Sequence, residues 1–290
     1  MSQDDIPMAP NPGQAPGSQA DPLDERLSQS LAGIKHKLLV MSGKGGVGKS
    51  TVSAQLAVGL SRRGLRVGLL DVDLHGPSIP RMLGAMGHAQ VNEDQQLIDP
   101  VVLEDGLKVI SVELLLPNKE TSVIWRGPMK IGVIKQLMGD VNWGDLDYLV
   151  IDAPPGTGDE PLTVAQEVED ARAVLVTTPQ EIALADLRKS VDFCIQVELP
   201  VLGLVENMSG LTCPHCGGEI ELLGSGGGQA TAERFGLNFL GRMPWDPQLR
   251  QAADAGRLSR FMSQDQAAEA PWAGLVERVL EATGEKGDKS

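Results

Sequence analysis

Aromatic residues and cysteines are scarce in this 290-residue chain, and basic residues are outnumbered by acidic ones. Phe, Trp and Tyr make up 3% of the residues, and the only thiols are Cys194, Cys213 and Cys216. Such a small, odd number excludes a disulfide framework and indicates a reducing compartment. Lysine and arginine number 25 against 39 aspartates and glutamates, which gives a net charge of −14. Nucleic acid and anionic lipid need a basic surface, so neither partner is expected.

Long hydrophobic runs are also missing. No stretch reaches the roughly 18 apolar residues of a membrane span, and residues 1–14 lack the apolar segment of a signal peptide. We therefore expect a cytoplasmic protein without a membrane partner. Residues 1–33 are proline-rich and poor in apolar side chains, which predicts a disordered arm with a short helix around Leu27–Leu31. Residues 284–290 are expected to be a flexible tail.

Short apolar runs alternate with helical patterns between residues 34 and 283. The run Leu38–Met41 is typical of a buried parallel strand, and Ser50–Arg63 has apolar residues at helical spacing. The other expected strands are Val67–Leu70, Leu107–Val112, Tyr148–Ile151, Ala173–Val176, Val201–Val205 and Phe239–Leu240. This alternation predicts one α/β domain with a doubly wound, mostly parallel sheet that is flanked by helices.

A glycine-rich loop follows the first predicted strand. Residues 43–50, GKGGVGKS, fit the phosphate-loop pattern G-x-x-x-x-G-K-[ST], and they lie between a strand and a helix as that pattern requires. The glycines let backbone N–H groups surround phosphate oxygens, and the helix start adds positive potential. We expect Lys49 to act on the β- and γ-phosphates and Ser50 to bind Mg²⁺. The expected nucleotide contacts are Gly43, Lys44, Gly45, Gly46, Val47, Gly48, Lys49, Ser50 and Thr51.

Lys44 is an unusual residue in this loop. A lysine directly after the first glycine gives KGGVGKST, which resembles the deviant phosphate loop of the superfamily that contains MinD, ParA and nitrogenase iron protein. The resemblance implies a second catalytic lysine that reaches the nucleotide of a partner subunit, and therefore a homodimer. A solvated loop lysine is the alternative interpretation.

Acidic residues follow two other predicted strands. Asp71 and Asp73 follow one of them, and Asp152 follows another. Because the carboxyl ends of parallel strands meet at one edge of a sheet, we expect these carboxylates near the phosphate loop. Asp73 is the catalytic candidate that orients the attacking water. Asp71 and Asp152 are expected to join Ser50 around Mg²⁺.

Two further residues are candidates for nucleotide contacts. Gly156, in a turn after a strand, is expected to donate its N–H group to the γ-phosphate and to respond to the nucleotide state. Asn207 has the amide chemistry that is needed to read a purine edge. Asparagine after a strand is also a common turn residue, so that interpretation stays open.

Cys213 and Cys216 form a C-x-x-C pair in a glycine-rich segment. Zinc or an iron–sulfur cluster takes four ligands, and Cys194 is expected inside a helix as a packing residue. Two identical pairs that face each other across the two-fold axis of a dimer supply four sulfurs. A bridging iron–sulfur cluster, a bridging zinc and a redox dithiol are the three possible interpretations.

The chain resembles the Mrp/ApbC family of iron–sulfur cluster carrier ATPases from about Gly33 to Leu280. The shared motifs are residues 42–51 (SGKGGVGKST), 73–80 (DLHGPSIP), 125–129 (WRGPM), 152–159 (DAPPGTGD), 206–209 (ENMS) and 213–216 (CPHC). The resemblance implies a SIMIBI-type P-loop fold, ATP hydrolysis with Mg²⁺, and a labile [4Fe-4S] cluster that bridges a homodimer. Its implied partners are cluster donors and apo iron–sulfur proteins as acceptors. His75 departs from the tyrosine of many members.

The alternative function is a positioning ATPase, like MinD or ParA, with a zinc-stapled dimer interface. Such a protein needs a basic DNA-binding face or a basic amphipathic tail. The last helical segment, Trp272–Leu280, has an apolar face but no basic one, and it contains Glu277. This pattern favours core packing over a membrane-surface helix.

Overall fold

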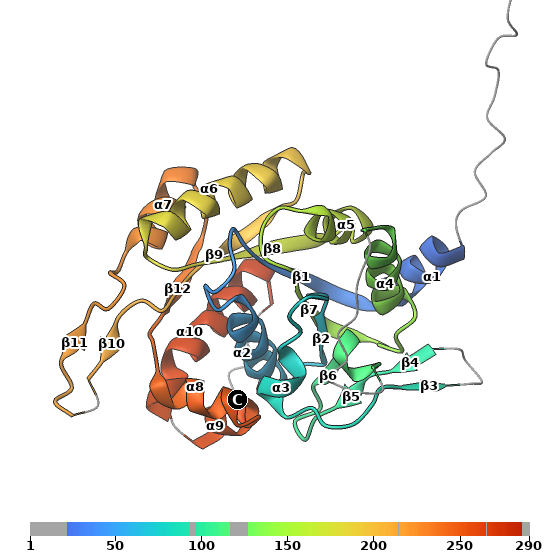
Figure 1. Cartoon of the computed structure of the whole chain (residues 1–290), viewed down its shortest axis with the longest axis horizontal. Coiled ribbons are helices and arrows are strands. Elements are labelled where there is room, and N and C mark those ends of the chain that lie inside the picture. Colours follow the sequence, from blue (N-terminus) through green and yellow to red (C-terminus); the bar gives the residue numbers. More distant parts are fainter. Residues whose placement is uncertain (1–21, 93–96, 117–126, 214, 265, 286–290) are drawn as a thin grey trace, which may run out of the picture.

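An eight-stranded sheet runs through the middle of the molecule, with helices on both faces (Figure 1). The computed structural model describes residues 22–92, 97–116, 127–213, 215–264 and 266–285. The strand order is β12-β9-β8-β1-β7-β2-β6-β5, and the pairings are parallel except for that of β5 with β6. The predicted doubly wound, mostly parallel α/β fold is confirmed.

The elements follow each other as strand and helix along most of the chain. The strands of the large sheet are β1 (Ile34–Ser42), β2 (Val67–Asp71), β5 (Val101–Val102), β6 (Lys108–Ser111), β7 (Leu146–Asp152), β8 (Ala171–Thr177), β9 (Val201–Asn207) and β12 (Phe239–Met243). Two small hairpins pair β3 (Gln90–Asn92) with β4 (Leu97–Asp99), and β10 (Leu211–Thr212) with β11 (Glu219–Ile220). The helices are α1 (Pro22–Ala32), α2 (Lys49–Arg62), α3 (Ile79–Leu83), η1 (Val112–Leu114), α4 (Gly127–Gly139), α5 (Asp159–Glu167), α6 (Glu181–Gln196), α7 (Gly227–Phe235), α8 (Pro247–Asp254), α9 (Leu258–Gln264) and α10 (Gln266–Thr283).

Two hydrophobic cores, one on each face, explain the continuous apolar runs of the strands. Successive side chains of a strand point to opposite faces. Leu38 and Val40 of β1 accordingly pack in the core that contains α2 and α10, whereas Leu39 and Met41 pack in the core that contains α4 and α6. Both faces need apolar residues, so the strands do not alternate with polar ones.

The C-terminal helix α10 packs in the first core, as its apolar face predicts. Trp272, Leu275 and Val279 are buried there. The helix lies so close to α2 that a Cβ atom on Gly59 would be 2.6 Å from a methyl group of Val276. Among the described residues, no helix has both the length and the hydropathy of a membrane span.

The N-terminal helix α1 is longer than the short helix expected around Leu27–Leu31. Leu27 and Leu31 are buried in the second core, and Gly139 of α4 lets the helices meet because a Cβ there would be 3.1 Å from the Leu27 backbone. Residues 22–32 therefore pack with the domain. Residues 1–21, 286–290 and the 125–126 part of the WRGPM motif lie outside the described residues.

Candidate nucleotide site and cysteine hairpin

The phosphate loop connects β1 to α2 at the carboxyl edge of the sheet. Gly46 and Gly48 have φ angles of +82° and +80°, a region that favours glycine. A Cβ atom on Gly48 would also lie 2.2 Å from Nδ2 of Asn207, so the close approach requires a glycine. Gly48 is the N-cap of α2 and has no side chain to cap the helix. The first N–H groups of α2 are therefore suited to bind an anion.

Three side chains of α2 converge on Asp152 at the end of β7. Nζ of Lys49 lies 2.7 Å from Oδ1 of Asp152, and the Ser50 hydroxyl donates to Oδ2 at 2.6 Å. The Ser53 hydroxyl donates to Oδ1, also at 2.6 Å. Lys49 is 6% exposed and Asp152 is fully buried. The structure thus brings together the lysine, hydroxyl and carboxylate that the sequence assigns to phosphate and Mg²⁺.

Asp71 lies beside Asp152, because β2 and β7 pair in register at these two residues. Its carboxyl group accepts the N–H groups of Asp73 at 3.0 Å and Ser78 at 3.2 Å, so it shapes the loop after β2. Burial, and then the charge of Asp152, raises the pKa of Asp71 to about 8. A divalent cation would offset this repulsion, and carboxylates with a hydroxyl are a donor set that Mg²⁺ accepts. The residues present therefore fit Mg²⁺.

Asp73 lies further out on the same loop. Its Oδ1 accepts the N–H groups of His75 at 3.2 Å and Gly76 at 3.1 Å. A cavity of about 230 Å³ joins Asp73 to the phosphate loop. The other residues around this cavity are Ser42, Gly45, Gly46, Gly48, Lys49, Ser50, Thr51, Ser78, Met82 and Pro155. The catalytic candidate and most of the predicted phosphate contacts therefore share one space.

Gly156 and Asn207 already have partners in the chain. The N–H group of Gly156, which has a φ of +93°, donates to the Ser42 carbonyl at 2.8 Å. The buried amide of Asn207 donates to the Val47 carbonyl at 2.9 Å. Contacts of Gly156 with the γ-phosphate and of Asn207 with a purine stay predictions. To make such a contact, Gly156 or Asn207 would have to give up its present hydrogen bond or use another of its polar atoms.

Lys44 is half-buried in the phosphate loop. Its backbone carbonyl accepts the Ser42 hydroxyl at 3.0 Å. Within the part of the chain that the structure describes, its ammonium group forms no ion pair. The role of Lys44 at a partner subunit's nucleotide stays a prediction.

Cys213 and Cys216 lie in the turn of the β10–β11 hairpin. The N–H group of Cys213 donates to the Gly218 carbonyl at 2.8 Å, and that of Gly217 donates to the Cys213 carbonyl at 2.9 Å. Hydrogen bonds from the backbone N–H groups of His215 and Cys216 lower the pKa of the Cys213 thiol. A lowered pKa favours the thiolate, which is the metal-binding form.

The third cysteine has a different environment. Cys194 is buried in α6, and burial raises the pKa of its thiol to about 12. The prediction that it is a helix packing residue is confirmed. Among the described residues, no group of three or more His, Cys, Asp or Glu side chains is arranged to hold a metal.

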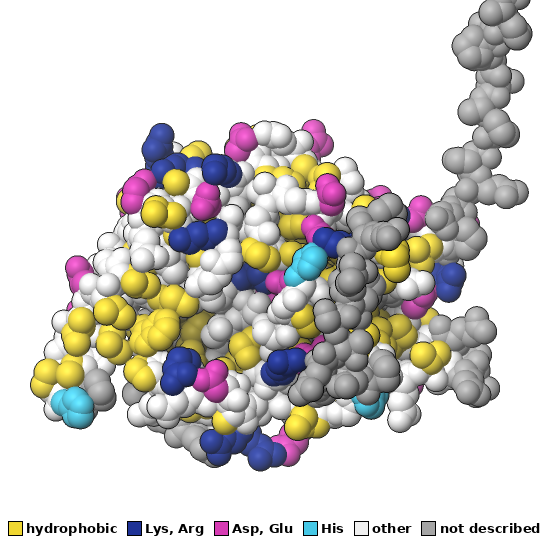
Figure 2. All heavy atoms as spheres, viewed as in Figure 1, with side chains coloured by type: hydrophobic (Ala, Val, Ile, Leu, Met, Phe, Trp, Pro, Cys, Tyr) yellow, Lys and Arg dark blue, Asp and Glu magenta, His cyan; other side chains and the backbone are white. Residues whose placement is uncertain are grey.

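The cysteine hairpin extends from the body of the molecule (Figure 1), and hydrophobic side chains lie on the neighbouring surface in Figure 2. Ile220 and Leu222, which follow the cysteines, are 44% and 60% exposed. The half-buried Cys213 and the exposed Cys216 lie beside these apolar side chains, and such a surface is suited to contact another protein.

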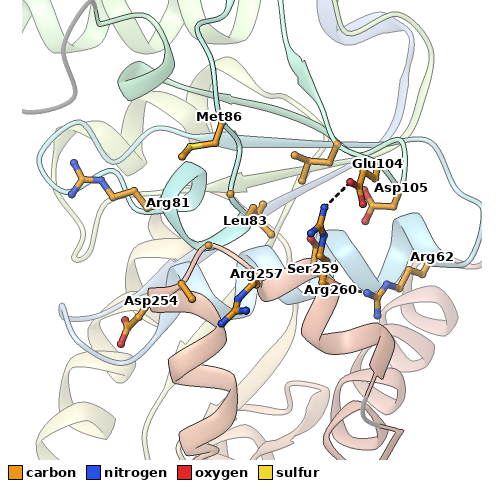
Figure 3. A pocket seen from close by; sticks show the side chains of 14 residues that line it. Arg62, Arg81, Leu83, Met86, Glu104, Asp105, Asp254, Arg257, Ser259 and Arg260 are labelled. Carbon is orange, nitrogen blue, oxygen red and sulfur yellow. Dashed lines mark hydrogen bonds and ion pairs between the residues drawn. The ribbon is translucent and has the colours of Figure 1, made fainter.

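A larger cavity, of about 960 Å³, lies between α3, the β5–β6 turn and the α8–α9 region (Figure 3). Two of its arginines are held by neighbouring carboxylates: Arg260 pairs with Glu104 at 2.7 Å, and Arg81 pairs with Glu113 at 2.7 Å. It contains none of the residues predicted to act on nucleotide or metal. The small cavity at the phosphate loop, not the large one, is therefore the candidate site.

Ser53 is a site residue that sequence reasoning missed. Its position three residues after Ser50 places it on the same face of α2, and this spacing was the available signal. The pattern of the phosphate loop ends before it, so nothing in the motif draws attention to it. In the structure it is fully buried and holds the same carboxylate as Lys49 and Ser50.

Comparison with known proteins identifies the family. The sequence profile described as ParA, NUBPL iron-transfer P-loop NTPase, matches residues 33–280. The chain belongs to this family of iron-transfer P-loop NTPases. The match confirms the resemblance to the iron–sulfur cluster carriers that the sequence motifs indicated.

Relatives within the family are similar over most of their length. The iron-sulfur cluster carrier protein of Methanocaldococcus jannaschii is 47% identical over 234 residues, which cover 80% of this chain and 80% of that protein. The cytosolic Fe-S cluster assembly factor NUBP2 homolog of Dictyostelium discoideum is 50% identical over 228 residues, 77% of this chain and 86% of that protein.

Solved structures agree with the family. The nucleotide-binding protein of Archaeoglobus fulgidus in complex with ADP, in which cobalt was found, superposes with a TM-score of 0.73 and is 41% identical; the match covers 82% of this chain and 93% of that one. The cell division ATPase MinD of Pyrococcus furiosus has a TM-score of 0.61 at 23% identity over 85% and 98% of the chains, which shows likeness of fold alone.

Proposed function

We propose that this protein is an ATP-hydrolysing carrier of iron–sulfur clusters. It holds a labile [4Fe-4S] cluster between two subunits, takes it from cluster donors and passes it to apo iron–sulfur proteins in the cytoplasm. The observation that carries the proposal is the exposed C-x-x-C hairpin, with its thiolate-favouring Cys213, on a domain with a complete phosphate loop. The printed names of the carrier and cytosolic assembly relatives support it.

Each side chain of the nucleotide site has a proposed role. Lys49 neutralises the β- and γ-phosphates, while Ser50 and Asp152 hold Mg²⁺, with Asp71 in the surrounding shell. Mg²⁺ held there would offset the negative charge of the phosphates. Asp73 orients the attacking water, and Lys44 reaches the nucleotide of the partner subunit.

The proposed assembly is a homodimer. Each chain offers Cys213 and Cys216, so a four-thiolate cluster needs two chains related by a two-fold axis. A cluster at this edge stays accessible, because Cys216 is exposed. An acceptor can therefore present its own thiolates to the cargo without unfolding of the carrier.

Anaerobic reconstitution tests the function. The wild-type protein should bind about four iron and four sulfide per dimer, and the loaded dimer should activate an apo iron–sulfur enzyme. Cys213→Ala should lose the cluster and the transfer but keep ATP binding. Cys194→Ala is the matched control, because that thiol is buried in α6 and should not affect the cluster. Stoichiometric zinc without iron after anaerobic isolation, together with failed reconstitution, would contradict the carrier function and leave the nucleotide site intact.

A further inference from the structure

Glu206 is a fully buried acidic residue at the end of β9. Its Oε1 accepts the N–H group of Gly226 at 2.8 Å and the hydroxyl of Ser209 at 2.5 Å. Its Oε2 accepts the N–H group of Gly228. Nε of Arg242 lies 3.7 Å from Oε1. One carboxylate thus satisfies three donors in the interior.

These donors stand at the two ends of the segment that carries the cysteine hairpin. Ser209 precedes β10, and Gly226 and Gly228 begin α7 after β11. The glycines are required here, because Gly226 has a φ of +83° and a Cβ on Gly228 would be 2.9 Å from Oε2 of Glu206. The positive end of the α7 dipole also favours a carboxylate at this place. Glu206 therefore connects the two ends of the hairpin segment through its hydrogen bonds.

The next residue, Asn207, connects the same strand end to the phosphate loop. Its amide donates to the Val47 carbonyl at 2.9 Å. Because successive side chains of a strand point to opposite faces, Glu206 points to the α7 face and Asn207 to the α2 face. Leu204 and Val205 confirm this alternation, since they lie in the second and first cores respectively. Two adjacent residues thus hold the cysteine hairpin and the nucleotide loop.

We propose that Glu206 is a positioning residue for the cysteine pair, and that Glu206 and Asn207 together couple nucleotide occupancy to the hairpin. A nucleotide that repositions the Val47 carbonyl changes the end of β9 through Asn207, and Glu206 carries that change to both ends of the hairpin. A nucleotide shifts the hairpin only if it binds two conformations of the protein, which differ in the hairpin, with different affinity. The coupling is reciprocal, so the conformation of the hairpin also affects the affinity for nucleotide. The role of the cysteine pair in this inference rests on the proposed function. The effect of nucleotide on the hairpin can be measured on protein without a cluster.

Hydrogen–deuterium exchange over residues 209–228, with and without Mg·ADP, tests the coupling on iron-free protein. In the wild type, the nucleotide should change the exchange of this segment. Glu206→Gln keeps the side-chain size but replaces one acceptor oxygen with an NH₂ donor. We expect its segment to exchange roughly tenfold faster or more, and to lose the response to nucleotide. Glu206 does not contact the phosphate loop, so this variant should still bind Mg·ADP, and the exchange is compared at saturating nucleotide.

Thr231→Ala is the matched control. The Thr231 hydroxyl donates to the Gly227 carbonyl at 2.8 Å, so this change loosens α7 without touching Glu206. It should keep the nucleotide response of the hairpin. Should Glu206→Gln fail to fold, Ser209→Ala carries the test, because it removes one contact of the carboxylate and should weaken the response in part.

Loaded protein gives a second readout, the rate of cluster loss to an iron chelator with and without Mg·ADP. The ratio of the two rates should differ from one in the wild type and fall to about one in Glu206→Gln. The proposal is overturned if nucleotide does not change the exchange of residues 209–228 in the wild type. It is also overturned if Glu206→Gln responds to nucleotide as the wild type does. A protein that binds no cluster but shows the exchange pattern overturns the carrier function and leaves the coupling standing.

Discussion

The carboxyl groups of Asp71 and Asp152 are neighbours at the ends of two paired strands, and both are buried. Two such groups disfavour each other's ionisation. The arrangement explains why the pKa of Asp71 is raised to about 8, mainly through burial and then through the charge of Asp152. It also makes the stability of the protein depend on pH in a defined direction.

Asp71→Asn tests this dependence. A carboxyl group whose pKa is higher in the folded state than in the unfolded chain stabilises the fold when protonated. Its contribution is complete below the ordinary value of 3.8 and is lost as pH rises to about 8. Relative to Asp71→Asn, the free energy of unfolding of the wild type should therefore fall between about pH 4 and pH 8. Denaturant unfolding at several pH values, without Mg²⁺ or nucleotide, measures the difference; parallel curves would contradict the raised pKa.

Lys49→Ala and Lys44→Ala should separate binding from turnover. Lys49 supplies a fixed positive charge at the phosphates, so its loss should weaken ATP binding by roughly ten- to hundredfold. In the proposed function Lys44 acts in the assembled dimer, so Lys44→Ala should affect hydrolysis more than affinity. Calorimetry with Mg·ATP and a phosphate-release assay measure the two effects. Equal losses of affinity in both variants would argue against the division of roles.

Asp73→Asn should keep Mg·ATP binding and slow hydrolysis by roughly hundredfold or more, as expected for loss of a group that orients and activates water. The amide keeps an acceptor oxygen for the N–H groups of His75 and Gly76, so the loop should stay folded. Single-turnover kinetics separate the chemical step from binding. Normal hydrolysis in this variant would show that another group performs the role.

Leu27→Ala should destabilise the domain by roughly 2–5 kcal/mol, because the side chain is 2% exposed and packs in the second core. Ser28→Ala, at an exposed position of the same helix, should change stability by no more than about 0.5 kcal/mol. Urea unfolding compares them. Similar small effects for both would mean that α1 does not contribute to the folded domain.

The sequence predicted those parts of the fold and site that follow from local pattern. Apolar runs identify the strands, and a parallel sheet brings their carboxyl ends together, which places Asp152 beside Lys49 and Ser50 without further information. The cysteine pair is visible for the same reason, since its spacing is local. The chain could therefore be assigned to its family from short motifs.

Contacts between distant segments were not predictable in this way. The partner of Asn207 is a carbonyl of the phosphate loop, and the partners of Glu206 are glycine amides beyond the hairpin. Both contacts depend on how the end of β9 packs against other elements. The spacing of apolar residues along the sequence does not predict that packing. The extent of α1 was missed because Pro22 and the polar residues after it resemble a linker, whereas Leu27 and Leu31 are buried in the second core.

Because Lys49 is paired with Asp152, the binding of nucleotide requires Lys49 to exchange this carboxylate for a phosphate group. A phosphate group has to displace a carboxylate that already satisfies the lysine at 2.7 Å. Metal-free ATP would leave that buried carboxylate without a counter-charge, which is costly. Bound Mg²⁺ would supply a new counter-charge to Asp152, and Lys49 could then turn to the phosphates. Nucleotide and metal should consequently enter as one unit, with strong thermodynamic cooperativity between them.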